Sequence, residues 1–209
     1  MKKMFLIAAV AVLGMNSADA QVKFGVKAGP QLTNIVGDDF EDSEMKFGFN
    51  VGGYANIRFS EAFAFQPELL YSMQGTKYSG SETETILGEE VTYDYDSKVN
   101  LSYIQIPLMM KWYAYDGLNF EFGPQVGFNV AAKYDTEQTI TTSEGSITEQ
   151  QDGDIEDAET VDFGLNIGAG YELPMGLNFG IRYGLGLTDV VKDVDGKNSV
   201  FSLGIGYTF

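Results

Sequence analysis

Apolar side chains occupy every second position over an unusually long stretch, residues 118–133, LNFEFGPQVGFNVAAK. One phase of this alternation holds Leu118, Phe120, Phe122, Pro124, Val126, Phe128, Val130 and Ala132. A period of two indicates a β-strand with two unlike faces. Because ordinary strands have only about 5–6 residues, a strand this long predicts special surroundings on its apolar side.

The same alternation recurs in seven more segments: residues 22–29, 46–59, 63–73, 104–112, 161–173, 177–187 and 201–209. Tight turns are expected at 60–62, 114–117 and 174–176. Longer polar loops are expected at 38–44, 77–97, 134–160 and 188–198. No helix is expected after the amino-terminal segment. The apolar phase of all eight segments lacks Asp, Glu, Lys and Arg.

Twelve residues rising ~3.3 Å each, at a tilt of about 40°, cover roughly 30 Å, the thickness of a bilayer core. Short turns at one end and long loops at the other are typical of outer-membrane barrels. We therefore predict an all-β fold, an eight-stranded antiparallel up-and-down transmembrane β-barrel. Its apolar phase faces lipid, and both chain ends lie on the periplasmic side.

A soluble barrel with its apolar phase around a ligand is the alternative. Three features favour the membrane. The polar phase is rich in glycine, which suits a narrow lumen. Aromatic residues gather near the short turns. The last strand ends in alternating apolar residues typical of the signal that the barrel-assembly machinery reads: Phe201, Leu203, Ile205, Tyr207 and Phe209.

Residues 1–20 have the three parts of a secretory signal peptide. Lys2 and Lys3 precede an apolar core at 5–13 that is too short to span a bilayer. Ala18 and Ala20 form a small-x-small cleavage site before Gln21. We expect a signal peptide at 1–20 and a barrel domain at 21–209, in the outer membrane of a Gram-negative bacterium. A buried amino-terminal strand is the alternative.

The chain has no Cys, no His and a formal net charge of -17. The charge argues against nucleic acid as a partner, because phosphate binding needs Lys and Arg. Without His, the commonest general base and metal ligand are absent. No nucleophile–base pair stands out, so we expect no enzyme, no cofactor and no defined metal site.

The inward phase carries charges of both signs: Lys23, Lys27, Arg58, Lys111 and Arg182 against Glu68, Glu121, Asp162 and Glu172. The turn at 114–117 places Lys111 across from Glu121. One interpretation is a set of ion pairs inside a filled lumen. The other is the selectivity lining of a pore, although eight strands leave little room for one.

Most acidic residues lie in the expected long loops. The simplest interpretation is solvation and charge repulsion. Two functional alternatives remain: divalent cations bridging these carboxylates to lipopolysaccharide, and a protein partner bound at strands extended beyond the surface.

The segment SYIQIPLMMKWYAYDGLNFEFGPQVGFNVAAK, residues 102–133, resembles the PorT-like outer-membrane β-barrel family. The likeness lies in the Tyr-x-x-Ile-Pro-Leu run at 103–108, in Lys111, in the Gly-Pro-x-Val-Gly run at 123–127, and in FGVKAGPQLTN at 24–34. The resemblance implies an OmpX-type barrel, and some members are implicated in protein secretion. The expected role is structural or interactive, in contact with lipid, cations, lipopolysaccharide or protein partners. A narrow channel and a secretion accessory are the alternatives.

One place breaks the alternation. Val99, Leu101 and Tyr103 are apolar on odd positions, whereas the apolar phase is even from Ile104 onward. Either a β-bulge near residues 103–104 resets the phase, or this part of the strand projects beyond the membrane.

Overall fold

A computed structural model describes residues 21–40, 42–86 and 89–209. These residues form a 3₁₀ turn, η1 (Asp38–Phe40), and nine β-strands. The strands are β1 (Gln21–Val36), β2 (Glu44–Arg58), β3 (Phe63–Ile86), β4 (Glu89–Tyr115), β5 (Leu118–Thr142), β6 (Gly145–Asp154), β7 (Val161–Glu172), β8 (Leu177–Val191) and β9 (Val194–Thr208). The predicted signal peptide, with Ala18 and Ala20, lies outside the described residues, which begin at Gln21.

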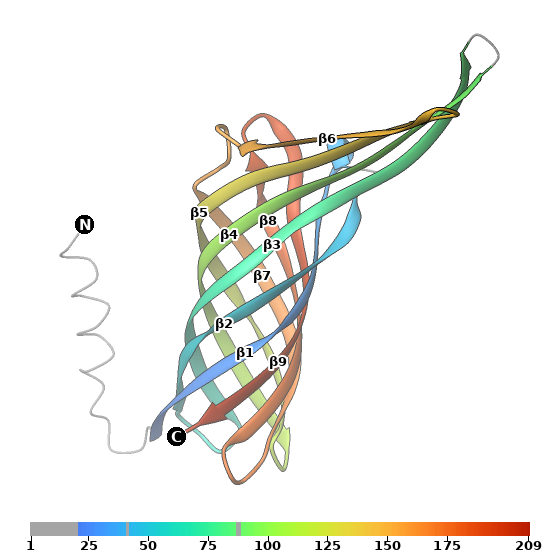
Figure 1. Cartoon of the computed structure of the whole chain (residues 1–209). Coiled ribbons are helices and arrows are strands. Elements are labelled where there is room, and N and C mark those ends of the chain that lie inside the picture. Colours follow the sequence, from blue (N-terminus) through green and yellow to red (C-terminus); the bar gives the residue numbers. More distant parts are fainter. Residues whose placement is uncertain (1–20, 41, 87–88) are drawn as a thin grey trace.

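Eight of these strands close into a ring. Each pairs antiparallel with its neighbour, in the order β4-β3-β2-β1-β9-β8-β7-β5, and a β4–β5 pairing completes the circle. Closure leaves no unpaired strand edge inside the lipid-spanning wall. The predicted antiparallel up-and-down barrel is confirmed (Figure 1). In the described part of the chain, no helix is long and apolar enough to cross a bilayer.

The ninth strand, β6, pairs only with the distal half of β5. The sequence interpretation was wrong here: residues 77–97, 134–160 and 188–198 are largely strands rather than loops. Thr, Val, Ile and Tyr alternate with the acids in these segments, and β-branched and aromatic residues favour strands. The three tight turns are confirmed between β2 and β3, β4 and β5, and β7 and β8.

The apolar phase lies on the outer surface of the barrel, as predicted. Phe122 is 62%, Leu165 53% and Ile205 58% exposed, whereas the alternate positions are mostly buried and polar or glycine. At Gly29 and Gly123, an added Cβ would collide with the carbonyl oxygens of Leu203 and Leu108. Glycine therefore lets neighbouring backbones approach in this narrow lumen.

The predicted β-bulge near residues 103–104 of β4 is wrong, and projection of the upper part of this strand beyond the membrane stays a prediction. Alternation continues without a break in β4, and Leu101 and Tyr103 are buried in the lumen. The bulge is instead in β5, because Ser102 pairs with Ala131 and Tyr103 with Asn129. Leu101 and Tyr103 pack with Ile35 and Val190 in an apolar cluster. This cluster fills the end of the lumen away from the short turns, and the rest of the lumen is mostly polar, with a few buried apolar residues such as Leu70 and Met109.

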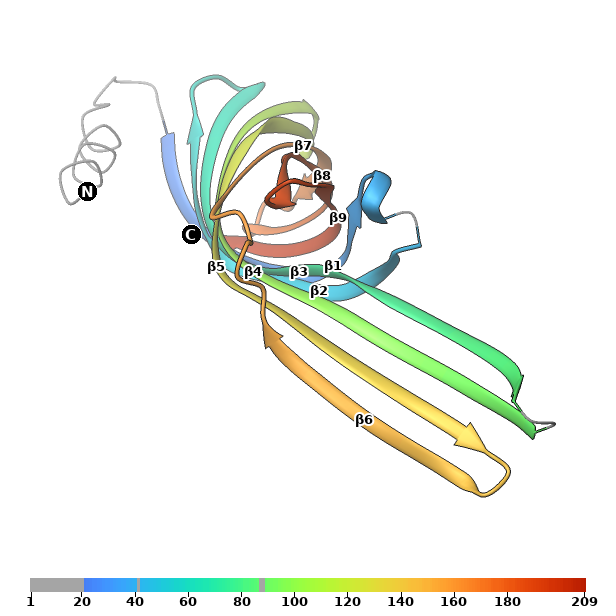
Figure 2. The same cartoon turned by 90° about the horizontal axis from the view of Figure 1, so that it is seen from above.

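Beyond the barrel, four strands continue as a sheet that we call the arm. It consists of residues 78–86 of β3, 89–97 of β4, 134–142 of β5, and β6 (Gly145–Asp154). Seen from above, the arm projects sideways past the barrel wall, with the distal part of β3 and β6 as its two edge strands (Figure 2).

Candidate functional site

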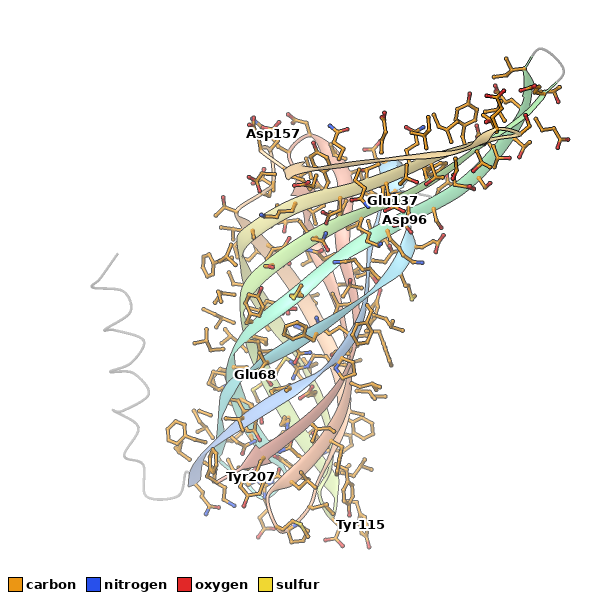
Figure 3. The ribbon with its side chains drawn as sticks, in the orientation of Figure 1. Glu68, Asp96, Tyr115, Glu137, Asp157 and Tyr207 are labelled. Atoms are coloured by element: carbon orange, nitrogen blue, oxygen red, sulfur yellow. The ribbon has the colours of Figure 1, made fainter. Side chains whose placement is uncertain are left out.

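A charged network crosses the middle of the lumen, at the level of Glu68 in Figure 3. Arg182 on β8 donates hydrogen bonds from Nη1 and Nη2 to the two carboxylate oxygens of Glu68 on β3, each at 2.8 Å. Its Nε donates to Oε1 of Glu121 on β5 at 2.7 Å. Arg182 thus ties two carboxylates together across the barrel, in the fork geometry that makes such bonds strong.

Two lysines complete this central network. Lys27 Nζ lies 3.2 Å from Glu68 Oε2. Lys111 Nζ lies 4.0 Å from Glu121 Oε2, and these two residues are register partners. The Glu68 side chain is 0% exposed and its neighbours only slightly more. Three cations therefore face two carboxylates, and the charges nearly cancel.

The other four predicted charges lie outside this network. Arg58 and Glu172 pair at 3.8 Å toward the short turns, and the Arg58 guanidinium lies 3.9 Å from the ring centre of Tyr113. Lys23 lines the mouth of the barrel at the short-turn end, together with Arg58. Asp162, toward the other end of the lumen, accepts a hydrogen bond from Thr188 at 3.0 Å.

Uncharged partners of these groups were missed by the sequence reasoning. Gln66 donates to Glu68 at 2.8 Å, and Asn56 donates to Gln66 and to the Tyr113 hydroxyl at 3.0 and 3.1 Å. The Tyr113 hydroxyl donates to Glu172 at 2.9 Å. The sequence offered one indication of their role. These residues belong to the inward phase of their strands, and buried polar groups need hydrogen-bond partners.

The lumen around Arg182 contains little free space. Two cavities of about 30 and 40 Å³, both lined by Lys27 and Arg182, lie there. Each has about the volume that one water molecule occupies. The mouth at the short-turn end is wider, with a cavity of about 880 Å³.

The outer surface near the short turns carries the predicted aromatic belt. The rings of Phe59 and Phe63 lie 6.4 Å apart, and those of Trp112 and Phe120 lie 5.8 Å apart. Tyr207 lies at this end (Figure 3). The predicted assembly residues are exposed on the outer face of the last strand or just after it: Phe201, Leu203, Ile205, Tyr207 and Phe209.

The arm is held by cross-strand pairs. Hydroxyl groups pair between Thr83 and Thr92 at 3.0 Å and between Thr139 and Thr148 at 2.9 Å. The ring of Tyr95 lies over Gly80 on the neighbouring strand. Such an aromatic covers the backbone that glycine leaves open.

Glu44 of β2 fastens the base of the arm to the barrel. It accepts a hydrogen bond from Ser79 at 2.6 Å and lies 2.9 Å from Lys77 Nζ. The Ser79 hydroxyl and the Lys77 ammonium lower the pKa of Glu44. These contacts stabilise the arm above the ordinary carboxyl pKa, and they are lost as pH falls through the lowered pKa.

The arm itself is strongly acidic. Residues 78–97 and 134–154 contain no Lys or Arg, and their acids are Glu82, Glu84, Glu89, Glu90, Asp94, Asp96, Asp135, Glu137, Glu144, Glu149, Asp152 and Asp154. Asp96 and Glu137 lie where the arm leaves the barrel (Figure 3). Among the described residues, no three acids converge in a way that would hold a metal ion.

Comparison with known proteins found solved structures that are similar to this chain. Similar folds include the attachment invasion locus protein Ail of Yersinia pestis, solved with the heparin analogue sucrose octasulfate (14% identity, TM-score 0.45, 90% of this chain and 99% of that chain). Neisserial surface protein A has 11% identity and a TM-score of 0.44, with 90% and 99% covered. CarO of Acinetobacter baumannii has 12% identity and a TM-score of 0.40, with 88% and 97% covered. No curated protein matches the sequence.

The family model of the outer membrane protein beta-barrel domain matches residues 14–192, most of the chain. This confirms the broader resemblance and supports an outer-membrane location, while the narrower PorT-like membership stays a prediction. The chain belongs to the outer membrane protein beta-barrel domain family.

Proposed function

We propose that this protein is a non-enzymatic surface protein, in which the barrel is the anchor and the arm binds an extracellular protein partner by strand addition. In this proposal the signal peptide is removed before Gln21, and the assembly machinery reads the last strand. Strand addition gives affinity through main-chain hydrogen bonds at a free sheet edge.

The outer edge of β6 carries the proposal. All ten of its residues pair with β5 without a register shift, and no described strand pairs with its other side. Exposed edges are normally blunted by charged side chains, especially Lys, by Pro or by a bulge. The β6 sequence, GSITEQQDGD, contains no Lys and no Pro, and its charges are the acids Glu149, Asp152 and Asp154. These acids repel a partner of like charge but not a basic one.

A photo-reactive residue tests this proposal in native membranes. Placed at Ile147 on β6, it is expected to trap a partner protein as a defined adduct, identified by mass spectrometry. Met175 in a periplasmic turn is the matched control, since the two side chains are 68% and 69% exposed. Adducts at Met175 alone would contradict the proposal and favour the periplasm-facing secretion accessory.

The charged network argues against the channel alternative, because it crosses a lumen with cavities of only about 30 and 40 Å³. Pure protein in a planar bilayer is therefore expected to show no steady unit conductance. A reproducible unit conductance that disappears on heat unfolding would overturn the filled-lumen interpretation.

Lipid and lipopolysaccharide are the proposed surroundings of the outer face. The apolar belt meets acyl chains. Above it, Lys98 and Lys133 lie on the same outer face, with side chains 50% and 65% exposed. Lys98 lies 2.9 Å from Asp96 and Lys133 lies 3.8 Å from Asp154, so each keeps only part of its charge for an outside anion. These ammonium groups suit the phosphates of lipopolysaccharide, and divalent cations bridge the acids to the same phosphates.

A further inference from the structure

The free edge of β6 also defines the chemistry of its partner. We propose that β6 accepts a positively charged, extended polypeptide segment in which basic and apolar side chains alternate. This inference rests on the proposed strand-addition function and adds the identity of the side chains that the edge selects.

The negative charge of the arm favours a positively charged partner. The arm carries twelve acids and no Lys or Arg, within residues 78–97 and 134–154. A second copy would place acids against acids, and like charges across paired strands are destabilising. A basic segment instead meets the carboxylates of Glu149, Asp152 and Asp154 on β6.

The two faces of β6 differ, and this difference favours a partner in which basic and apolar residues alternate. Successive side chains of a strand point to opposite faces. Asp152 is in register with Asp135 and, through it, with Lys98 on the face that continues the lipid-facing surface. Ile147 lies on the opposite face, in register with Ile140. An added strand therefore places basic residues beside Asp152 and beside Asp154, which lies 3.8 Å from Lys133 and remains 79% exposed. It places an apolar residue beside Ile147.

The main-chain groups supply the second part of recognition. The two-residue turn of this hairpin closes at the pair Thr142–Gly145. Antiparallel pairing alternates along the strand, so the N–H and C=O of Thr148 point away from β5. A positively charged molecule without an extended backbone can meet the carboxylates, but it cannot form main-chain hydrogen bonds with the edge of β6. Charge recognition and main-chain pairing can therefore be tested separately.

Three synthetic ten-residue peptides test the inference on the full mature barrel in nanodiscs, with binding measured by fluorescence anisotropy. One alternates Lys with Val, the second alternates Glu with Val, and the third is the Lys peptide with every backbone N–H methylated. The Lys peptide is expected to bind at least tenfold more tightly than either of the others. Equal binding of the Lys and Glu peptides, or no effect of methylation, would overturn the proposal.

Matched variants locate the binding edge. Thr148→Pro removes one outward N–H and is expected to weaken Lys-peptide binding about tenfold, whereas Thr148→Val keeps that N–H and should bind like wild type. Asp152→Asn with Asp154→Asn should weaken binding more than Glu156→Gln with Asp157→Asn, although both pairs remove two charges. If the two pairs of variants are indistinguishable, binding is only to the general acidic surface.

The two proposals fail differently. If Ile147 traps a partner in membranes while the Lys and Glu peptides bind equally, strand addition stands and the basic partner is wrong. If the Lys peptide binds nowhere near β6 and Ile147 traps nothing, both are wrong.

Discussion

Replacing Glu68 by alanine is expected to lower the free energy of unfolding by about 3–5 kcal/mol, the range for breaking a buried ion pair from one side. The substitution leaves Arg182, Lys27 and Lys111 with Glu121 as the remaining carboxylate of the central network. These cations lie inside the barrel, and the cavities that Lys27 and Arg182 line measure only about 30 and 40 Å³. Urea titration of the refolded barrel in detergent micelles measures the change.

Two further variants show whether the charge network is responsible. Glu61→Ala removes an exposed carboxylate from a periplasmic turn and is expected to change stability by less than about 0.5 kcal/mol. Adding Arg182→Ala to Glu68→Ala should restore part of the loss, because Arg182, the cation that loses two hydrogen bonds to Glu68, is then gone. A loss below about 1 kcal/mol for Glu68→Ala would mean that water, rather than Glu68, satisfies these cations.

Leu165→Arg is expected to destabilise the barrel by about 2–4 kcal/mol, the penalty for a cation at mid-depth on the lipid face. Leu165 lies in the middle of β7, is 53% exposed, and has Phe163 and Ile167 beside it on the same face. Folding yield into vesicles and urea titration both report the effect.

A luminal substitution provides the control for Leu165→Arg. At Gly204 the nearest atoms to an added Cβ are 3.9 Å away, so Gly204→Ser fits and should leave the folding yield close to wild type. Gly168 is unsuitable, since its Cβ would lie 2.6 Å from the Ile181 carbonyl oxygen. Equal yields for Leu165→Arg and Gly204→Ser would show that the outer face is not in lipid.

The strands of the arm could not be predicted from the sequence. Residues such as those at 92–96, TYDYD, have strand-forming side chains at every second position, but their acids are typical of a solvated loop. The register that pairs Thr92 with Thr83 and Thr141 could not be predicted from composition. Because that pairing could not be predicted, the free edge of β6 could not be predicted either.

The luminal charges show a similar limit. Their inward direction follows from alternation alone, and the Lys111–Glu121 pairing follows from a short turn. The contact between Arg182 and Glu68 joins residues 114 positions apart. No local feature of the sequence indicates that Arg182 contacts Glu68 rather than Asp162.

The sequence by itself determined which side chains face lipid, how many strands close the ring and where the tight turns lie, because a period of two and short connections are local properties. Only the tertiary structure decided which charges meet across the lumen, which apolar residues fill its outer end, and that the acidic segments form a sheet with an open edge. These depend on the register at which the ring closes, which brings together residues from distant parts of the chain.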